Sequence, residues 1–344
     1  MAGGTGGHVI PGLTVANALL AQGAKVSWLG TEQGLEAKLV PAAKIPIHYI
    51  VRTPVRGKSI KTLFVTPWRL LCAFIQVFLV MLKINPDVVV GMGGFVSFPG
   101  GIVAWLLRKP LIIHEQNAIA GLTNRFLAKI AKKRFQAFPN VFLDGITIGN
   151  PLRPEIINTS LPSERFANRV GPLRLLIVGG SQGAIALNQV VVEAMRQLMP
   201  NQHPDMWHIA GAGKTKEIKK IYEELNMTVK LDEFVNDVAE AYQWADIVLG
   251  RAGALTVSEL AAVGVGSILI PFPHAVDNHQ TFNAKLLADV NAAMVVPQHE
   301  FTSQKLIQFI TKLQQNRSEL LRMAKQARSV AKLNATEQLV KACL

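Results

Sequence analysis

Two glycine-rich stretches decide the fold: Gly3-Gly4-Thr5-Gly6-Gly7-His8 near the start of the chain, and Gly179-Gly180-Ser181-Gln182-Gly183 at its midpoint. Each precedes a segment with the apolar spacing of a helix. A glycine loop that leads into a helix presents backbone N–H groups at the positive end of the helix dipole, where phosphate binds. Two such loops predict two nucleotide-type domains facing across a cleft, which suits a reaction between two phosphorylated substrates.

Helix and strand patterns alternate after each loop. The first series is a helix over 11–22, a strand over 25–29, a helix from 66 to before Pro86, a strand over 87–90, a helix ending at 107 and a strand over 111–114. The second series includes strands over 173–178, 247–249 and 267–270 and a helix over 254–263, with long helices from Thr302 onward. Such alternation predicts parallel sheets in an α/β protein. We expect a first domain over 1–153 and a second over 154–330.

One feature departs from this alternation. A strand should lead into the first glycine loop, yet only Met1 and Ala2 precede Gly3. A central parallel strand is hard to remove from such a sheet. We therefore expect the native chain to carry several more residues, mostly apolar, before Met1.

Composition narrows the class of protein. Cys72 and Cys343 are too few for a disulfide framework or a metal quartet, which fits a reducing cytosol. No signal peptide opens the chain. The longest apolar run, 70–82, contains Gln76 and falls short of the roughly 20 residues that a spanning helix needs, so we expect no membrane crossing.

Positive charge is concentrated in the first half. The net charge is +13, and residues 1–153 hold 17 Lys and Arg against 5 Asp and Glu, whereas 154–344 hold 19 against 18. A basic domain indicates a surface for something anionic, either nucleic acid or acidic phospholipid. Between 58 and 83, aromatic residues stand among basic ones, which favours an anionic membrane. The alternative is a core role for the apolar residues, which we expect for Leu71 and Phe78.

The basic residues expected at that membrane face are Lys58, Lys61 and Arg69, beside apolar residues such as Trp68. Each basic residue near an anionic surface contributes about 1 kcal/mol of attraction. The segment therefore predicts reversible binding that weakens with added salt.

The first glycine loop has two interpretations. His8 stands at its rim, where an imidazole can accept a proton from a hydroxyl group near neutral pH. Equally, a loop histidine can tie down the backbone. A second glycine loop over 91–94, with Gly100-Gly101, also follows a predicted strand, and ligands bind at the carboxyl ends of strands in open sheets. Two loops on one domain suit a diphosphate.

The second half offers a carboxylate and a polar cluster. The stretch 253–259 is a glycine turn into a helix, with Glu259 expected in the first turn. Glu259 either complements the helix dipole or holds two ribose hydroxyls. The cluster 277–280 with Asn283 either binds sugar hydroxyls or is a solvated loop. No Asp-x-Asp sequence occurs, so we expect no metal ion and no cofactor.

Seven motifs along the whole chain resemble the MurG family of peripheral bacterial glycosyltransferases. They are GGTGGHVIPG (3–12), GMGGFVSFPGG (91–101), HEQNAIAGLTNR (114–125), GNPLR (149–153), GGSQGA (179–184), GALTVSE (253–259) and DNHQ-TFNA (277–284). The resemblance implies a GT-B fold, in which two Rossmann-like domains with parallel sheets face each other across a cleft and a final helix, 331–344, returns to the first domain.

The resemblance also implies an activity. Such an enzyme moves N-acetylglucosamine from UDP-GlcNAc to the muramyl 4-hydroxyl of undecaprenyl-pyrophosphoryl-MurNAc-pentapeptide (lipid I) with inversion, giving lipid II for peptidoglycan synthesis. Its partners would be UDP-GlcNAc, lipid I, anionic phospholipid and cell-wall synthesis proteins, without nucleic acid. It would act as a peripheral protein on the cytoplasmic face of the bacterial inner membrane.

Site residues follow from the resemblance position by position. The implied UDP-GlcNAc-binding residues are Thr5, Gly6, Gly7, Asn117, Arg153, Ser181, Val235, Ala254, Leu255, Thr256, Val257, Ser258, Glu259, His279 and Gln280. Glu259 would hold the ribose, the amides of 254–256 would face the α-phosphate, and Val235 would pack by the uracil. Whether His279 or Gln280 contacts the sugar stays open.

On the acceptor side, the resemblance implies His8, Glu115, Gly93 and Gly94, the two glycines at the acceptor diphosphate. His8 is the first choice of catalytic base and Glu115 the second. Two positions depart from the family pattern, because Phe95 replaces a frequent tyrosine and Phe98 a small residue.

Two other classes of protein and one related GT-B enzyme compete with this interpretation. A nicotinamide oxidoreductase would need a G-x-G-x-x-G spacing that 3–8 lacks, although Glu32 is an ambiguous ribose acid. A nucleic-acid-binding module would use stacking aromatics, but Phe64, Trp68, Phe74 and Phe78 follow a helical apolar pattern. A closer rival is another GT-B enzyme that uses a UDP-sugar, such as a diacylglycerol glycosyltransferase or a UDP-GlcNAc 2-epimerase.

Overall fold

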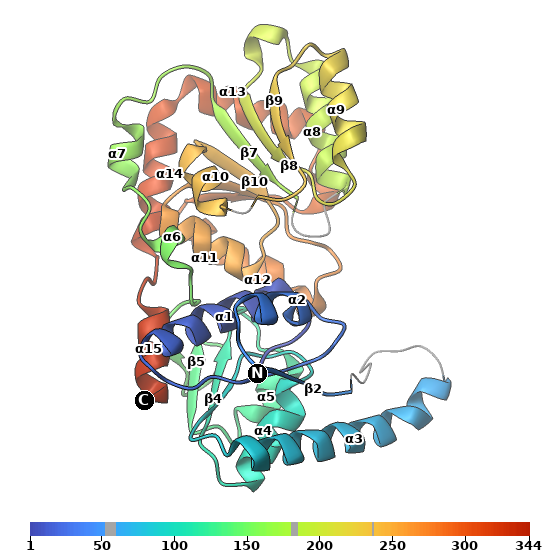
Figure 1. The fold of residues 1–344 in the computed structure, drawn as a ribbon. Coiled ribbons are helices and arrows are strands. Elements are labelled where there is room, and N and C mark those ends of the chain that lie inside the picture. Colours follow the sequence, from blue (N-terminus) through green and yellow to red (C-terminus); the bar gives the residue numbers. More distant parts are fainter. Residues whose placement is uncertain (52–59, 180–184, 236) are drawn as a thin grey trace. The chain divides into compact units, whose positions relative to one another are not determined.

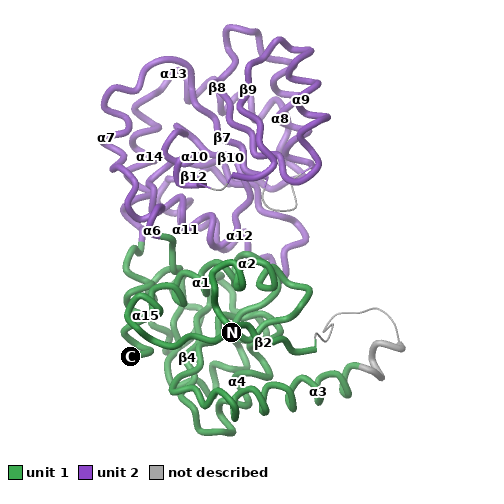
Figure 2. The backbone as a smooth tube through the Cα atoms, in the orientation of Figure 1, with its two compact units in different colours: residues 1–153, 332–344 green, residues 154–331 purple. Residues whose placement is uncertain are grey.

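The computed structural model describes residues 1–51, 60–179, 185–235 and 237–344, with the side chains of 60–65 left out. The chain forms two compact units (Figure 2). Unit 1 comprises Met1–Arg153 and Lys332–Leu344, and unit 2 comprises Pro154–Ala331. Helices and parallel strands build both units, so the predicted α/β class with two Rossmann-like domains is confirmed.

Unit 1 contains short parallel strands and the helices that cover them (Figure 1). Its strands are β1 Trp28–Gly30, β2 Ile47–Tyr49, β3 Val89–Gly91, β4 Leu111–Glu115, β5 Lys133–Gln136 and β6 Ile146–Thr147. Its helices are α1 Gly6–Ala21, α2 Glu36–Ala42, α3 Ile60–Ile84, α4 Ser97–Leu106, α5 Leu122–Leu127 and α15 Ala335–Cys343. Strand β1 pairs with β2, and the other four form a separate sheet in the order β3-β4-β5-β6.

Met1 and Ala2 lie between these two sheets. The Met1 amino group donates to Val90 O at 2.8 Å, and Met92 N donates to Met1 O at 2.9 Å. On the other side, Trp28 Nε1 donates to Ala2 O at 3.0 Å. The two residues thus pair with β3 as the end of a parallel strand would.

A cavity of about 570 Å³ continues from Met1 along the facing edges of the two sheets. Residues 24–29, which lead into and form β1, line one side, and residues 84–90, which lead into β3, line the other. Parts of α1 and the end of α15 also line it. The position expected for a strand before the first glycine loop therefore holds two residues and this cavity.

Helix α1 begins earlier than the sequence predicts. His8 N and Val9 N both donate to Thr5 O at 3.2 Å, which places Gly6 and Gly7 in its first turn. The predicted start at Pro11 is wrong, because Pro11 lies inside the helix. Gly6, Gly7 and His8 of the first glycine stretch are therefore helical, and their N–H groups belong to the helix terminus.

Helix α3 also starts before its predicted position, and Pro67 lies inside it. Its portion Thr66–Ile84 is long and apolar enough to cross a membrane, judged by length and composition. The window that passes this test is longer than the apolar run 70–82, on which the expectation of no membrane crossing was based. Buried core helices pass the same test, but only 17% of this window is buried. Ala73, Val77 and Met81 recur every four residues and form its buried stripe on unit 1.

Unit 2 is one six-stranded parallel sheet in the order β12-β11-β10-β7-β8-β9. Its strands are β7 Arg174–Val178, β8 Asp205–Ile209, β9 Val229–Asp232, β10 Ile247–Gly250, β11 Gly266–Leu269 and β12 Ala293–Val295. Its α-helices are α6 Pro154–Ile157, α7 Pro162–Ala167, α8 Ile185–Gln197, α9 Thr215–Glu224, α10 Val238–Trp244, α11 Ala254–Val263, α12 His279–Ala288, α13 Ser303–Gln315 and α14 Arg317–Ser329. Short 3-10 helices are η1 Pro200–Gln202, η2 Val276–Asn278 and η3 Gln298–Glu300.

Each unit has a hydrophobic core formed by its strands and helices. In unit 2, continuous apolar strands such as β7 and β10 are buried, as central parallel strands require. In unit 1, α15 packs its Leu339 and Val340 with Val15, Ile112 and Ile148. Candidate site residues such as Gly93, Glu115 and Gly253 stand at the carboxyl ends of strands β3, β4 and β10.

Candidate functional site

The two glycine loops of unit 1 touch each other. Gly93 and Gly94 have φ values of +99° and +79°, which favour glycine. A side chain at Gly94 would collide with Gly3 O, and one at Gly93 would stand 2.7 Å from His8 Cδ2. The first loop, the loop after β3 and His8 therefore form one continuous surface, with the start of α1 beside it.

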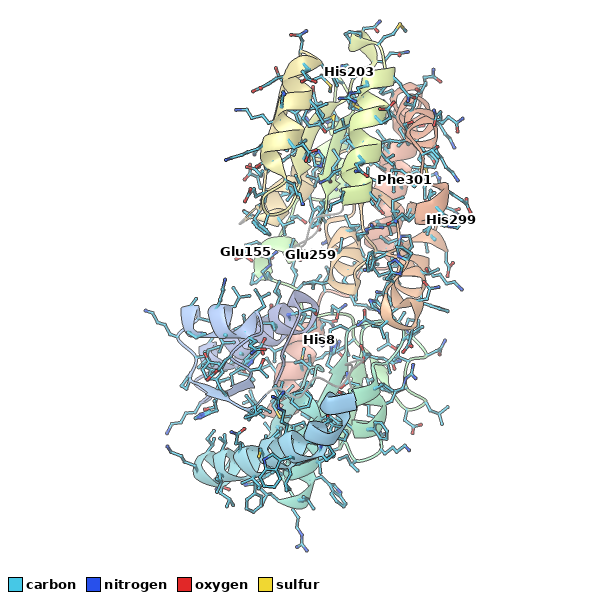
Figure 3. The ribbon with its side chains drawn as sticks, turned by 90° about the vertical axis from the view of Figure 1, so that its right-hand side faces the viewer. His8, Glu155, His203, Glu259, His299 and Phe301 are labelled. Atoms are coloured by element: carbon cyan, nitrogen blue, oxygen red, sulfur yellow. The ribbon has the colours of Figure 1, made fainter. Side chains whose placement is uncertain are left out.

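His8 is the third residue of α1 (Figure 3) and is half-buried. Its Nδ1 lies 3.4 Å from Thr5 Oγ1, and its ring lies against the Cα of Gly93. The catalytic role and the structural role considered for His8 both fit this position. The structure thus brings His8 of the predicted acceptor side together with Gly93, and Thr5 of the predicted donor site lies beside His8.

Glu115, the second candidate base, ends β4 and is 1% exposed. Its Oε1 accepts hydrogen bonds from Asn117 N at 3.0 Å and Asn117 Nδ2 at 3.3 Å. Its Oε2 accepts from Gly121 N at 3.1 Å and Asn124 Nδ2 at 2.9 Å. Four hydrogen bonds hold the carboxylate, an arrangement that satisfies the buried group and fixes the loop after β4.

Asn124, on α5, is a residue that the sequence reasoning did not single out. Its amide nitrogen donates to His114 O at 3.1 Å as well as to Glu115, and lies 3.6 Å from the position of a Cβ on Gly93. Asn124 thus connects the Glu115 loop to the glycine loop that contacts His8. It lies inside the HEQNAIAGLTNR motif, which was the only sequence signal for it.

Glu36, on α2, is a second residue missed from the sequence. It is fully buried, and it accepts hydrogen bonds from Gly4 N at 2.9 Å, Thr31 N at 3.0 Å and Thr31 Oγ1 at 2.8 Å. It therefore fixes the first glycine loop to the end of β1. Nothing in the sequence around Glu36 indicates this role.

His114 precedes Glu115 and is completely buried. Its Nε2 lies 2.9 Å from Gly149 O, and burial lowers its pKa to about 4. The ring is therefore neutral near pH 7, and its Nε2–H donates to the carbonyl. It fixes the chain just before Arg153, which is partly exposed and ends the first segment of unit 1.

In unit 2, the candidate donor residues surround the start of α11. Gly253 is the N-cap, and Val257 N donates to Gly253 O at 2.9 Å. The N–H groups of Ala254, Leu255 and Thr256 belong to the first turn, where a helix binds anions. Ser258 Oγ bonds back to Ala254 O at 2.9 Å.

Glu259 lies in the second turn of α11 (Figure 3), so its predicted place in the first turn is wrong. The helix starts at Ala254 and has no acidic residue in its first turn. Dipole effects fade beyond the first turn, so this position weakens the dipole interpretation. The carboxylate is 6% exposed, and Tyr242 Oη donates to its Oε2 at 3.2 Å.

The polar cluster of unit 2 lies at the end of η2 and the start of α12. His279 Nδ1 lies 2.7 Å from Val276 O, and Gln280 Oε1 accepts from Phe272 N at 2.9 Å. Asn283 is buried and donates to Ala252 O at 3.2 Å. His279 and Gln280 thus each use one polar atom on their own loop, while Asn283 fixes the turn before α11.

Other predicted positions are placed singly. Asn117 folds back on Glu115, and Val235 follows β9 and is half-buried. Ser181, Lys58 and the side chain of Lys61 lie outside the described residues. Among the residues that the structure describes, no three His, Cys, Asp or Glu side chains come close enough to hold a metal ion.

Helix α3 carries an exposed apolar stripe on unit 1. Its members, spaced three and four residues apart, are Trp68, Leu71, Ile75, Leu79 and Leu82. Leu71 is 49% exposed and Phe78 39%, so the prediction that these two fill the core is wrong. The core stripe runs instead through Ala73, Val77 and Met81.

Phe98, on α4, contacts both of the neighbouring helices, α3 and α5. Its ring makes edge contacts with Phe74 of α3 at 6.2 Å and Phe126 of α5 at 6.0 Å between centroids. The residue that departs from the family pattern thus packs α3, α4 and α5 together.

Two protein-family models match the chain. The Glycosyltransferase family 28 N-terminal domain covers residues 1–136, and the Glycosyltransferase family 28 C-terminal domain covers residues 174–339. The chain belongs to glycosyltransferase family 28. The two glycine loops of unit 1 and the start of α11 in unit 2 fall inside the matched domains of this family.

Relatives within the family match over full length. A UDP-N-acetylglucosamine--N-acetylmuramyl-(pentapeptide) pyrophosphoryl-undecaprenol N-acetylglucosamine transferase of Marinobacter nauticus is 46% identical, covering 100% of this chain and 96% of the relative. A Burkholderia pseudomallei protein of the same description is 47% identical, covering 100% and 94%. The crystal structure of Acinetobacter baumannii MurG has a TM-score of 0.86 and 40% identity, covering 99% of this chain and 97% of the other.

Proposed function

We propose that this enzyme transfers N-acetylglucosamine from UDP-GlcNAc to the muramyl 4-hydroxyl of lipid I, with inversion, to form lipid II. The observation that carries the proposal is full-length identity of 46–47% to relatives described as this transferase. The relatives reported above do not support the alternative GT-B enzymes, a diacylglycerol glycosyltransferase or a UDP-GlcNAc 2-epimerase. Family membership makes the protein a glycosyltransferase. The proposal therefore concerns which donor and acceptor it uses and which residues bind them.

The donor nucleotide binds chiefly in unit 2 in this proposal. The amides of Ala254–Thr256 at the start of α11 bind the α-phosphate, because they stand at the positive end of the helix dipole. Glu259 accepts hydrogen bonds from the ribose hydroxyls, and Val235 packs against the uracil. The remaining donor residues are those implied by the family motifs: Thr5, Gly6, Gly7, Asn117, Arg153, Ser181, Leu255, Val257, Ser258, His279 and Gln280.

The acceptor diphosphate binds at the paired glycine loops of unit 1. Gly93 and Gly94 carry no side chain, so backbone can approach a phosphate closely, and the N-terminal turn of α1 adds positive dipole. His8 lies at this surface and takes the proton of the 4-hydroxyl as that oxygen attacks C1 and UDP leaves. Glu115 instead fixes the loop after β4, since four donors already occupy its oxygens.

The enzyme acts at the cytoplasmic face of the inner membrane in this proposal, through the exposed stripe of α3. A polyprenyl-linked acceptor stays in the bilayer, so the acceptor-binding unit must approach it. Trp68 is 67% exposed and Leu79 60%, and Arg69 follows Trp68 in the sequence. An aromatic and aliphatic face flanked by basic residues suits an anionic interface, and one buried stripe keeps α3 on the protein.

Incubation with radiolabelled UDP-GlcNAc and a short-chain lipid I analogue tests the proposal. We expect label in a lipid-extractable product and release of UDP in equal amounts. UDP-GlcNAc hydrolysis or epimerisation without acceptor modification would contradict it. A parallel reaction contains UDP-glucose and diacylglycerol in place of UDP-GlcNAc and the lipid I analogue.

A further inference from the structure

Glu259 is a buried carboxylate whose orientation depends on a neighbouring helix. A carboxylate removed from water needs hydrogen-bond donors, or its charged form becomes unstable. Tyr242, on α10, supplies one through its hydroxyl, which lies 3.2 Å from Glu259 Oε2. Tyr242 is itself 1% exposed, so water does not compete for this bond.

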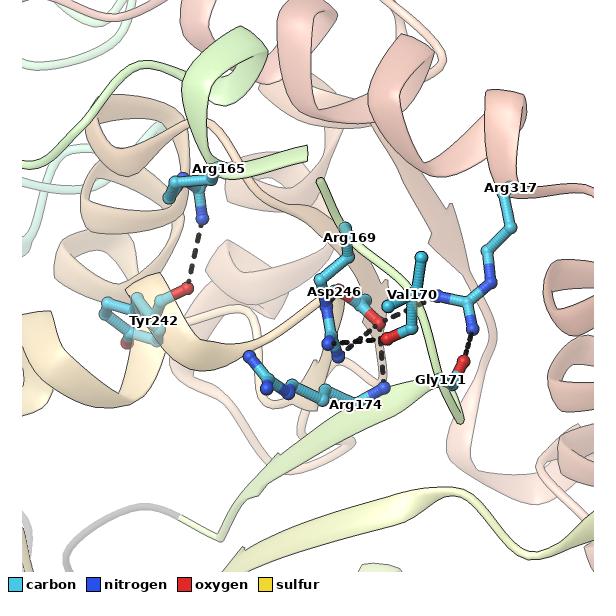
Figure 4. Close-up of polar contacts among 8 residues, drawn as sticks. All are labelled: Arg165, Arg169, Val170, Gly171, Arg174, Tyr242, Asp246 and Arg317. Carbon is cyan, nitrogen blue, oxygen red and sulfur yellow. Dashed lines mark hydrogen bonds and ion pairs between the residues drawn. The ribbon is translucent and has the colours of Figure 1, made fainter. Parts of the chain in front are cut away.

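Tyr242 is held at its backbone as well as at its hydroxyl. Arg165 Nη1 donates to Tyr242 O at 3.3 Å (Figure 4). The other terminal nitrogen of the same guanidinium donates to Val263 O at 3.2 Å and to Gly264 O. One arginine therefore binds carbonyls at the ends of both α10 and α11, where a cation also complements the helix dipoles.

The start of α10 is fixed too. Asp237 caps it by accepting hydrogen bonds from Ala239 N at 2.9 Å and Glu240 N at 3.2 Å. With both ends of α10 bonded, the Tyr242 ring has little freedom to move relative to α11. The hydroxyl of Tyr242 thus acts on Glu259 from a rigid element.

We propose that Tyr242 is a positioning residue for the nucleotide, whose hydroxyl sets the Glu259 carboxylate in the orientation that accepts hydrogen bonds from the ribose. This inference rests on the proposed ribose role of Glu259. Tyr242 does not touch the ligand. Its effect is to fix the acceptor before binding, so that the ribose hydroxyls meet an oriented carboxylate and less rotational freedom is lost on binding.

Tyr242→Phe tests the inference, because it removes the hydroxyl and keeps the ring. Calorimetry measures the Kd of UDP and of 2′-deoxy-UDP for the parent and the variant. We expect the Kd of UDP to rise about five- to tenfold, as for the loss of one hydrogen bond of ordinary strength. The Kd of 2′-deoxy-UDP, which keeps only the 3′-hydroxyl as a donor to Glu259, should rise by a smaller factor, so the preference for the ribonucleotide falls. The kcat for transfer should stay close to the parent value.

Tyr222→Phe is the matched control. Tyr222, on α9, is also buried in unit 2, and its hydroxyl bonds to Nδ1 of His208 on β8 at 2.9 Å. This variant should lose stability without changing the ratio of the two Kd values. An equal rise for both nucleotides in Tyr242→Phe, or no rise for either, would overturn the inference.

A double variant covers the case in which Tyr242→Phe folds poorly with the charged carboxylate left in place. Glu259→Gln removes the charge, and adding Tyr242→Phe to it should leave the ratio of Kd values as in Glu259→Gln alone. A further change in that ratio contradicts the inference. If the parent itself does not prefer UDP to 2′-deoxy-UDP, the ribose role of Glu259 fails and Tyr242 with it, whereas the transfer assay judges the proposed function separately.

Discussion

Asn124 Nδ2 donates to Glu115 Oε2 at 2.9 Å, and through this bond the loop after β4 is joined to the helix that follows it. Both side chains are 1% exposed. The pair belongs to a network in which both oxygens of the carboxylate have donors, three of them within six residues of Glu115. Glu115 is therefore a structural centre of the candidate acceptor side.

Replacing Glu115 by glutamine should destabilise unit 1. The new side-chain amide would place its N–H groups against the donors of Asn117 or Asn124, so we expect a loss of about 1 to 3 kcal/mol in the free energy of unfolding. Urea denaturation measures it. Glu32→Gln, at an exposed position of the same unit, is the control and should change little. Unchanged stability in Glu115→Gln would mean that the network does not hold the loop.

His8→Ala should lower turnover with lipid I analogue by roughly 100-fold, because general-base catalysis contributes about that factor. Affinity for UDP should stay near the parent value. Initial rates at saturating donor measure the first and calorimetry the second. His48→Ala, on β2, is the control. Near-normal turnover in His8→Ala would show that His8 is not the catalytic base and that its role is structural, through its contacts with Thr5 and Gly93.

Glu259→Ala should weaken UDP binding by about 1 to 3 kcal/mol through loss of charge-assisted hydrogen bonds. Titration calorimetry with UDP gives the value, and circular dichroism checks the fold. Glu240→Ala, on the exposed face of α10, should bind UDP as the parent does. The ribose assignment would be refuted by a folded Glu259→Ala protein with unaltered affinity.

Charge placed on the exposed stripe of α3 should detach the enzyme from membranes. Trp68→Glu with Leu79→Glu removes apolar area and adds repulsion from an anionic surface. We expect less sedimentation with phosphatidylglycerol or cardiolipin vesicles, lower turnover of full-length lipid I, and unchanged UDP binding. Met199→Glu, an exposed apolar position of unit 2, should sediment as the parent does. Equal sedimentation of the α3 variant and the parent shows that another surface binds the membrane.

Acid should destabilise unit 2 through His208. Burial lowers the pKa of His208 to about 4, whereas an unfolded histidine titrates near 6.5. The unfolded chain thus binds the proton first, so stability is complete above about pH 6.5 and falls as pH drops towards 4, by about 3 kcal/mol in all. Urea midpoints between about pH 4 and 7 measure this. His208→Gln should make the free energy of unfolding depend less on pH. If it falls as steeply in that variant, groups other than His208 cause the effect.

The sequence predicted the elements with the strongest patterns. Helix 254–263 matches α11 to the residue, and strands 173–178 and 247–249 match β7 and β10 within one residue, because apolar runs bounded by glycine leave few alternatives. The helix starts at Pro11 and Thr66 were wrong, because proline was taken as a first residue and both helices continue through it. A tertiary contact, such as the packing of α3 on α4, outweighs that local signal.

The sequence predicted the parts of the candidate site that depend on the backbone geometry of a motif. It did not predict the parts that a buried side chain holds in place. The glycines at 93 and 94 belong to a recognisable motif because positive φ demands them. Glu36, Asn124 and Tyr242 were missed, since each acts through a partner distant in sequence or on another element. No local pattern records which carboxylate a buried hydroxyl or amide will meet.

The contact of Gly94 with Gly3 O makes the two glycine loops of unit 1 depend on each other, although they are far apart in the sequence. A Cβ at Gly94 would collide with that oxygen, and one at Gly93 would stand 2.7 Å from His8 Cδ2. A substitution at either glycine therefore displaces the first loop as well as its own. We expect the two motifs to tolerate substitutions only in combination, so a library that randomises one loop alone should yield few folded proteins.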